Sequence, residues 1–154
     1  MRGRTVLGDD GLDDGLSLAE RILDSAGDAV IFADRSGTIR RFNRAAEALF
    51  GFSAEEALGQ SLDLIVPEHL RAAHWRGFDA AMKTGKLKLE GRPTLTRALH
   101  KSGRKLYVEM TFALVKGDGT LGAVAVARDV TERALRERAT QAGAPVSAAA
   151  GGSQ

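Results

Sequence analysis

Cysteine is absent from the 154 residues of the chain. Without thiols the chain has no disulfides, no thiolate-bound metal and no cofactor attached to a thiol. Histidine is scarce, since His69, His74 and His100 are the only three. They lack the His-Glu-x-x-His spacing of zinc proteases. The usual cysteine and histidine metal motifs are therefore excluded.

A strong excess of one charge is also missing, because the formal net charge is only +2. Nothing in this balance favours electrostatic binding of nucleic acid, so no nucleic-acid partner is expected. No apolar run approaches the roughly 20 residues that a membrane span needs. Residues 1–4 are not followed by the apolar stretch of a secretory signal. We therefore expect a cytoplasmic protein with no membrane partner.

Sequence motifs of catalysis are missing as well. No phosphate-binding loop and no dinucleotide-binding glycine pattern follows an expected strand. No nucleophile elbow brings serine, histidine and aspartate into one motif. The chain is therefore not expected to be an enzyme.

The composition that remains is typical of one globular domain. Hydrophobic residues make up 44% and charged residues 27% of the chain, and the length suffices for one ordinary core. Residues 1–15 are rich in glycine and aspartate and are expected to be a disordered tail. Residues 141–154 are rich in alanine, glycine and serine and are expected to be flexible. A single domain with flanking helices is predicted over 16–140.

Hydrophobic periodicity and turn residues predict short elements along this domain. Leu18, Ile22 and Leu23 share one side of an expected helix over 16–26, which packs either on the domain's own sheet or on a second copy of the chain. Expected strands cover 28–34, 38–42, 86–90, 94–100, 105–114 and 121–127. Short helices are expected from 44 and 53, and residues 128–133 lead into a polar helix that runs to about 140.

The longest expected helix runs from Pro67 to Gly85. Proline suits the first turn of a helix, and glycine suits the left-handed position after its end. Apolar or small residues recur inside it at spacings of three and four, and His74 falls in the middle of their stripe; the stripe consists of Leu70, Ala73, His74, Gly77, Phe78, Ala81 and Met82.

An imidazole on the apolar side of a helix has two explanations. One is a core histidine with a hydrogen-bonded partner. The other is an axial ligand to a metal centre, most plausibly haem iron. Gly77 lies on the same face and removes a side chain where a flat ring can lie. Neither explanation is excluded by the position of His74 alone.

Four stretches of the chain resemble the PAS family. They are the opening hairpin 28–39, the helical crossing 42–60, the turn Lys101-Ser102-Gly103 and the closing stretch 128–133. The resemblance covers about residues 18–138. It implies an α+β PAS fold, in which a five-stranded antiparallel sheet carries short helices and one long helix on one face. PAS domains bind haem, flavins, small acids or nothing, so the fold does not identify a ligand.

Within this family the segment 67–85 looks most like the haem-binding oxygen sensors of the FixL type. That resemblance implies haem b with His74 as the metal ligand. It also implies that Lys88 or Arg92 pairs with the haem propionates. Around the ring it places Leu70, Gly77 and Phe78 on the helix side, Leu89, Met110 and Phe112 in the distal wall, and Ala125 as a small residue facing the ring.

The chain departs from the FixL type at the residue that hydrogen-bonds bound oxygen. An arginine stands there in those sensors, and the matching position is Thr94, with Arg92 and Arg97 close in sequence. Carbon monoxide needs no such donor. Met110 is expected either to fill the core or to supply a thioether as sixth iron ligand.

Three functions follow from the resemblance. The first is a haem-based sensor of a diatomic gas or of redox state, which signals through its flanking helices to an unidentified partner or within a homodimer. The second is a cofactor-free dimerisation or interaction module. The third is a redox sensor with non-covalent FAD, on which Trp75 could stack. Absence of cysteine excludes flavin photochemistry through a cysteinyl adduct.

Overall fold

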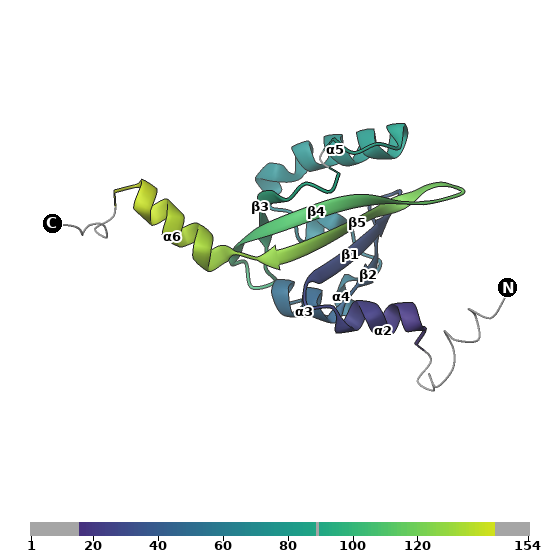
Figure 1. Cartoon of the computed structure of the whole chain (residues 1–154), viewed down its shortest axis with the longest axis horizontal. Helices are drawn as coiled ribbons and strands as arrows, with labels where there is room; N and C mark the ends of the chain where they lie inside the picture. The colour runs from purple at the N-terminus through teal and green to yellow at the C-terminus, as the bar shows by residue number, and fades with distance from the viewer. Residues whose placement is uncertain (1–15, 89, 144–154) are drawn as a thin grey trace.

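A single antiparallel sheet of five strands, in the order β2-β1-β5-β4-β3, is the frame of the domain (Figure 1). The computed structural model describes residues 16–88 and 90–143. The expected five-stranded antiparallel sheet is confirmed. Its strands are β1 Ala29–Asp34, β2 Ile39–Phe42, β3 Thr94–Leu99, β4 Lys105–Gly117 and β5 Gly119–Asp129.

The helices lie before, between and after these strands. In Figure 1 the long helix α5 runs along one edge of the sheet and α3 and α4 lie near the other, while α6 projects away from the body. Their bounds are α2 Leu18–Ser25, α3 Arg44–Phe50, α4 Ala54–Ala57, η1 Leu62–Leu64, η2 Glu68–Leu70, α5 Arg71–Thr84 and α6 Thr131–Gln141.

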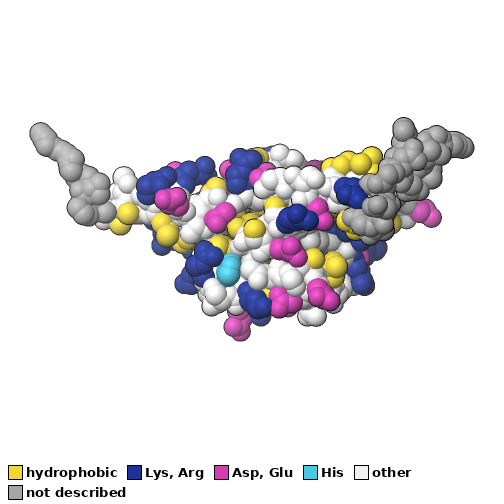
Figure 2. All heavy atoms as spheres, turned by 90° about the horizontal axis from the view of Figure 1, so that it is seen from below, with side chains coloured by type: hydrophobic (Ala, Val, Ile, Leu, Met, Phe, Trp, Pro, Cys, Tyr) yellow, Lys and Arg dark blue, Asp and Glu magenta, His cyan; other side chains and the backbone are white. Residues whose placement is uncertain are grey.

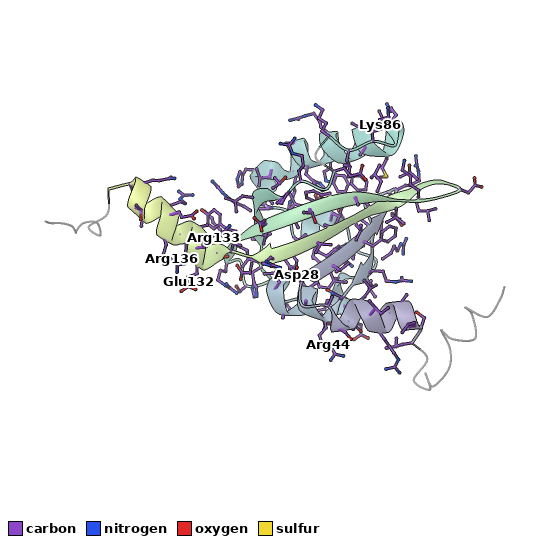
Figure 3. The ribbon with its side chains drawn as sticks, viewed as in Figure 1. Asp28, Arg44, Lys86, Glu132, Arg133 and Arg136 are labelled. Atoms are coloured by element: carbon purple, nitrogen blue, oxygen red, sulfur yellow. The ribbon has the colours of Figure 1, made fainter. Side chains whose placement is uncertain are left out.

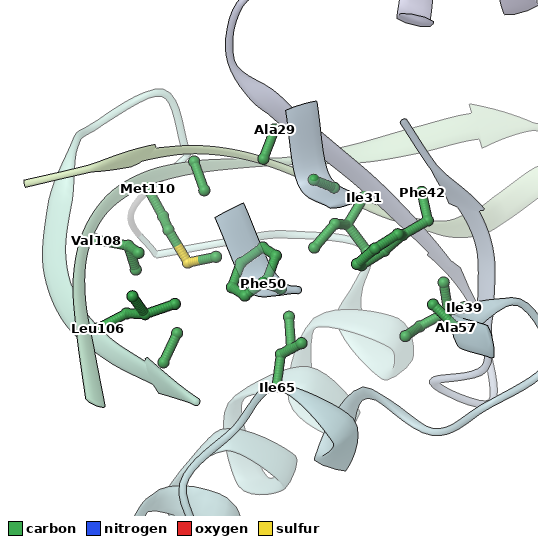
Figure 4. Close-up of a cluster of buried hydrophobic side chains, with 13 residues drawn as sticks. Ala29, Ile31, Ile39, Phe42, Phe50, Ala57, Ile65, Leu106, Val108 and Met110 are labelled. Atoms are coloured by element: carbon green, nitrogen blue, oxygen red, sulfur yellow. The ribbon is translucent and has the colours of Figure 1, made fainter. Parts of the chain in front are cut away.

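Alternating side chains of the strands build the core on one face of the sheet. The larger cluster surrounds Phe50, which α3 inserts against the sheet and which is fully buried (Figure 4). A smaller cluster joins Ala33 of β1 to Phe78, Ala81 and Met82 of α5. The long helix therefore packs over the same face, beside the main core.

Asn43 fixes the junction between α2, β1 and α3. Its Oδ1 accepts hydrogen bonds from the backbone N–H of Val30 at 2.8 Å and of Ala46 at 3.0 Å. Its Nδ2 donates to the carbonyls of Leu23 at 2.6 Å and Asp28 at 3.2 Å. The residue is 3% exposed. The N-cap of α3 therefore also holds the end of the N-terminal helix.

Two predicted elements differ in the structure. The helix expected from Pro67 begins with a single 3₁₀ turn, η2, and becomes α-helical only at Arg71. The strand expected over 86–90 is wrong for the described residues of that stretch, because none of them lies in a strand and residues 88 and 90 belong to a turn. The backbone N–H of Lys86 bonds to the Thr84 hydroxyl, and Gly91 has a positive φ of 74°. This hydrogen bond and the turn at Gly91 are found where a paired strand was expected.

Charged side chains of both signs are interspersed on the face that Figure 2 shows. This agrees with a net charge of only +2. None of the helices within 16–88 and 90–143 is both long and apolar enough to span a membrane. The predicted tail 1–15 and most of the predicted tail 141–154 lie outside the described residues.

Candidate functional site

His74 lies one turn before Phe78 on the side of α5 that faces the sheet. Its ring is half-buried and stacks on Phe78, with centroids 6.0 Å apart and planes inclined by 29°. The rings of His74 and Trp75 are in a T-shaped arrangement, with their centroids 4.7 Å apart. Nδ1 of His74 is buried and has no hydrogen-bond partner among the described residues. The hydrogen-bonded core histidine considered from sequence is thus not found.

Burial controls the charge of this imidazole. It lowers the pKa of His74 below the ordinary value of 6.5, while the carboxylates of Asp63 and Asp79 act in the opposite direction. The neutral ring is favoured because desolvation penalises the charged form. A neutral imidazole is the form that binds a metal.

Trp75 anchors α5 against the turn between β1 and β2. Its Nε1 donates to Asp63 Oδ1 at 2.8 Å, and its ring lies so close to Gly37 that a Cβ there would overlap it. The turn itself is fixed by Asp34. The Ser36 hydroxyl, which donates to Asp34 at 2.6 Å, is the main reason that the pKa of Asp34 lies well below its usual range.

The buried stripe of α5 is rotated relative to the predicted one. Trp75 belongs to it, whereas Ala73 and Gly77 are exposed. A Cβ on Gly77 would meet nothing within 4 Å, so the structure gives no packing reason for this glycine. The stripe predicted from periodicity did not include Trp75. The contact with Gly37 depends on the fold and has no local sequence signal.

The strands bring four other predicted site residues onto one face of the sheet. Thr94 pairs with Met110, and Phe112 pairs with Ala125. Met110 is 7% exposed and belongs to the main core cluster, while Phe112 and Ala125 are half-buried at its border. Since Phe78 packs on the same face, these residues form the sheet side of the candidate site.

The remaining predicted residues are not brought to this face. Leu70 lines a groove shared with β3 and α6. Lys88 and Arg92 are exposed in the loop that follows α5. Leu89 lies outside the described residues.

The other two histidines occupy different surroundings. His69 is exposed. His100 is half-buried: its Nδ1 accepts from the Ser102 backbone N–H at 3.0 Å, and its ring covers Gly51. No group of three histidine, aspartate or glutamate side chains suited to a metal ion occurs in the described part of the chain. His74 is therefore the candidate metal ligand that remains.

Comparison with known proteins agrees with this architecture. The oxygen sensor protein DosP of Escherichia coli is 29% identical over 112 residues, which cover 72% of this chain and 14% of DosP. The sensor protein FixL of Bradyrhizobium diazoefficiens is 29% identical over 111 residues, which cover 72% of this chain and 22% of FixL. The chain thus spans less than a quarter of either relative.

A solved PAS domain from Colwellia psychrerythraea superposes with a TM-score of 0.65 at 25% identity, covering 75% of this chain and 96% of that domain. The family model described as the PAS fold matches residues 23–135, which is most of the domain. This chain therefore belongs to the PAS family of sensory domains.

Proposed function

We propose that this domain is a haem-binding sensor of a diatomic gas or of redox state, with His74 as the iron ligand. The observation that supports this proposal most directly is the half-buried imidazole of His74. Its Nδ1 has no partner among the described residues, and burial lowers its pKa, which favours the neutral ring. The neutral ring would bind iron through Nε2. The buried Nδ1–H is costly without a partner, and a water molecule would then hold it. The resemblance of residues 67–85 to haem-binding sensors and the similarity to DosP, an oxygen sensor protein, support the choice.

Haem would supply an iron atom that binds a gas or changes oxidation state. The chain's own residues would hold it and exclude water. Phe78 flanks His74 on the helix, and Phe112 and Ala125 present an apolar surface on the facing sheet. The exposed cations Lys88 and Arg92 lie in the loop after α5, where propionates could reach solvent.

The strands connect this site to both flanking helices. Arg128 at the end of β5 donates two hydrogen bonds to Asp28, at 3.2 and 3.1 Å. Asp28 lies just before β1 (Figure 3). Asp28 in turn contacts Asn43, which holds the end of α2. A displacement of β5 would therefore reach α6 directly and α2 through Asp28. The signal would pass to a partner or to a second copy of the chain.

Absorption spectra of the haem-loaded protein in oxidised, reduced and carbon monoxide-treated forms test the proposal. We expect a Soret band that shifts with carbon monoxide, and loss of haem in His74→Ala. His69→Ala is the matched control, because that histidine is exposed, and it should retain haem. No Soret band after loading, or full haem retention in His74→Ala, would refute the assignment. A yellow protein with a flavin spectrum would support the FAD alternative instead.

A second candidate function, cofactor-free homodimerisation, is favoured by α2. The Ser17–Glu20 capping box starts this helix, yet none of its residues is buried. Leu18 is 47% and Ile22 is 59% exposed. An unpaired apolar helix face suits contact with a second copy.

Light scattering of the full chain tests this second candidate. We expect a dimer that Ile22→Lys converts to a monomer. Leu58→Lys, at an exposed leucine on a different element, should leave the dimer intact. A strict monomer at high concentration would exclude dimerisation without excluding haem binding.

A further inference from the structure

A groove of about 590 Å³ separates α6 from the body of the domain. Its walls come from η2, from β3 and from α6, and Tyr107 of β4 lies among them. His74 is not among its lining residues, so the groove is distinct from the candidate haem site. A volume of this size falls in the range of small-molecule pockets.

Two guanidinium groups face the groove around one aromatic ring. Arg97 pairs directly with Tyr107 across the sheet, and its Cζ lies 5.8 Å from the ring centroid. Arg138 of α6 has its Cζ at the same distance from that centroid, and its Nη1 donates to Tyr107 Oη at 2.7 Å. The two Cζ atoms are therefore no farther apart than twice 5.8 Å, and both side chains line the same groove.

These cations lack a carboxylate partner within the described part of the chain. No ion pair is formed there by Arg97 or Arg138, although seven other cationic side chains form one. Glu137 also lines the groove, but its Oε2 lies 3.9 Å from Arg133 Nε. The groove thus holds two guanidinium groups without an ion pair. Its one carboxylate, that of Glu137, is already paired with Arg133.

Tyr107 adds a donor to this arrangement. Its hydroxyl oxygen accepts from Arg138, and its own proton has no acceptor among the described residues. Beside these polar groups the groove offers an apolar wall. Leu95 of β3 is 56% exposed, and Leu70 and Ala134 line the groove with it.

We propose that this groove binds a small organic carboxylate with an apolar body. The carboxylate would bridge Arg97 and Arg138 and accept from the Tyr107 hydroxyl, because guanidinium groups and carboxylates form charge-assisted, often bidentate hydrogen bonds. The apolar body would cover Leu70 and Leu95. Such a ligand joins the edge strand β3 to the helix that leaves the domain, so it would hold α6 against the sheet.

Titration of the ¹⁵N-labelled full chain with phenylacetate, followed by NMR, tests the proposal. Saturable shifts are expected at Tyr107, Leu95 and Arg138. Neutral 2-phenylethanol should bind at least tenfold more weakly, because it leaves both guanidinium groups without an anion. Phenylphosphonate, in a parallel titration, distinguishes a carboxylate site from a general oxyanion site. Tighter binding of the phosphonate would overturn the assignment to carboxylates.

Substitutions at the two cations sharpen the test. Arg97→Gln and Arg138→Gln should each weaken phenylacetate binding about tenfold, and Arg97→Lys should lie between them and the unchanged protein. Arg136→Gln is the matched control, since Arg136 lies on α6 but pairs with Glu132 outside the groove (Figure 3). Equal affinity for the neutral alcohol, unchanged affinity in both glutamine variants, or shifts confined to Phe112 and Ala125 would overturn the proposal. These outcomes do not depend on whether haem binds at His74.

Discussion

Trp75 Nε1 and Asp63 Oδ1 are joined by a hydrogen bond of 2.8 Å that ties α5 to η1, the first of the two 3₁₀ turns before it. Asp63 takes part in a second contact with the same helix, because its carbonyl accepts from Arg71 Nη2 at 3.2 Å. Its carboxylate also raises the pKa of His74 against the effect of burial. One residue of η1 therefore helps to position the helix and partly offsets the effect of burial on its imidazole.

Trp75→Phe is expected to destabilise the domain by about 1–3 kcal/mol, because the Asp63 hydrogen bond and part of the ring packed on Gly37 are lost. Urea unfolding followed by circular dichroism measures this change. Asp63→Asn keeps an acceptor oxygen and should cost less. Equal stability of Trp75→Phe and the unchanged protein would show that α5 is held by other contacts.

The pKa of His74 is expected below 6.5 in the folded domain, since burial is the dominant influence on it. NMR titration of the imidazole signals gives the value directly. Asp63→Asn should lower this pKa further, because it removes a carboxylate that favours the charged ring. Asp79→Asn, which removes the weaker of the two influences, should produce a smaller decrease. A value above 6.5 in the unchanged protein would contradict the burial argument.

Stability should follow pH in the direction set by this shift. Below 6.5 the unfolded chain binds a proton at His74 that the folded domain does not yet bind, so the free energy of unfolding falls as pH falls from 6.5 toward the lowered pKa. Above 6.5 the contribution is fully present. Urea unfolding at several pH values should therefore show a weaker dependence between pH 5 and 7 in His74→Gln, a range set by the ordinary histidine pKa of about 6.5. The same slope in both proteins would assign it to other groups.

Local signals in the sequence predicted most elements of the fold. The opening hairpin ends at Asn43, which caps α3, and Ser53 forms a capping box with Glu56; both residue types are typical of helix starts. The strand predicted over 86–90 was wrong. Its alternating pattern resembles a strand, but Thr84 and Gly91 take part in local turns. Periodicity indicates which side chains can share a face. It does not indicate whether a neighbouring strand has backbone groups available for hydrogen bonding, so it cannot show that a strand will pair.

The candidate site was predictable only in part. His74 was found from its place on the helix, but the stripe was centred one position away from Trp75 because the Gly37 turn that receives the indole is far off in sequence. The cluster of Arg97, Tyr107 and Arg138 was not found at all. Those residues meet only after β3 pairs with β4 and the Arg138 side chain of α6 reaches Tyr107.

Gly122→Ala is expected to destabilise the domain by at least about 2 kcal/mol. A Cβ at this buried position would overlap the Ala33 carbonyl and stand 2.8 Å from Phe32 Cζ. Gly77→Ala is the matched control, because its Cβ would meet nothing within 4 Å on the exposed side of α5. It should stabilise the helix by about 1 kcal/mol. Thermal unfolding of both variants measures the contrast, and similar melting temperatures would contradict it.

Asn43→Asp should destabilise the domain by about 3 kcal/mol, although it retains the oxygen that caps α3. The amide nitrogen that donates to Leu23 and Asp28 is replaced by a charged oxygen facing two carbonyls in a buried place. The exposed cap Ser53→Ala provides the comparison, with an expected loss of about 1 kcal/mol. Hydrogen exchange should further show that α2 opens faster in Asn43→Asp, because its last turn loses its tie to the core. If only α3 is affected, then the amide nitrogen does not hold the N-terminal helix.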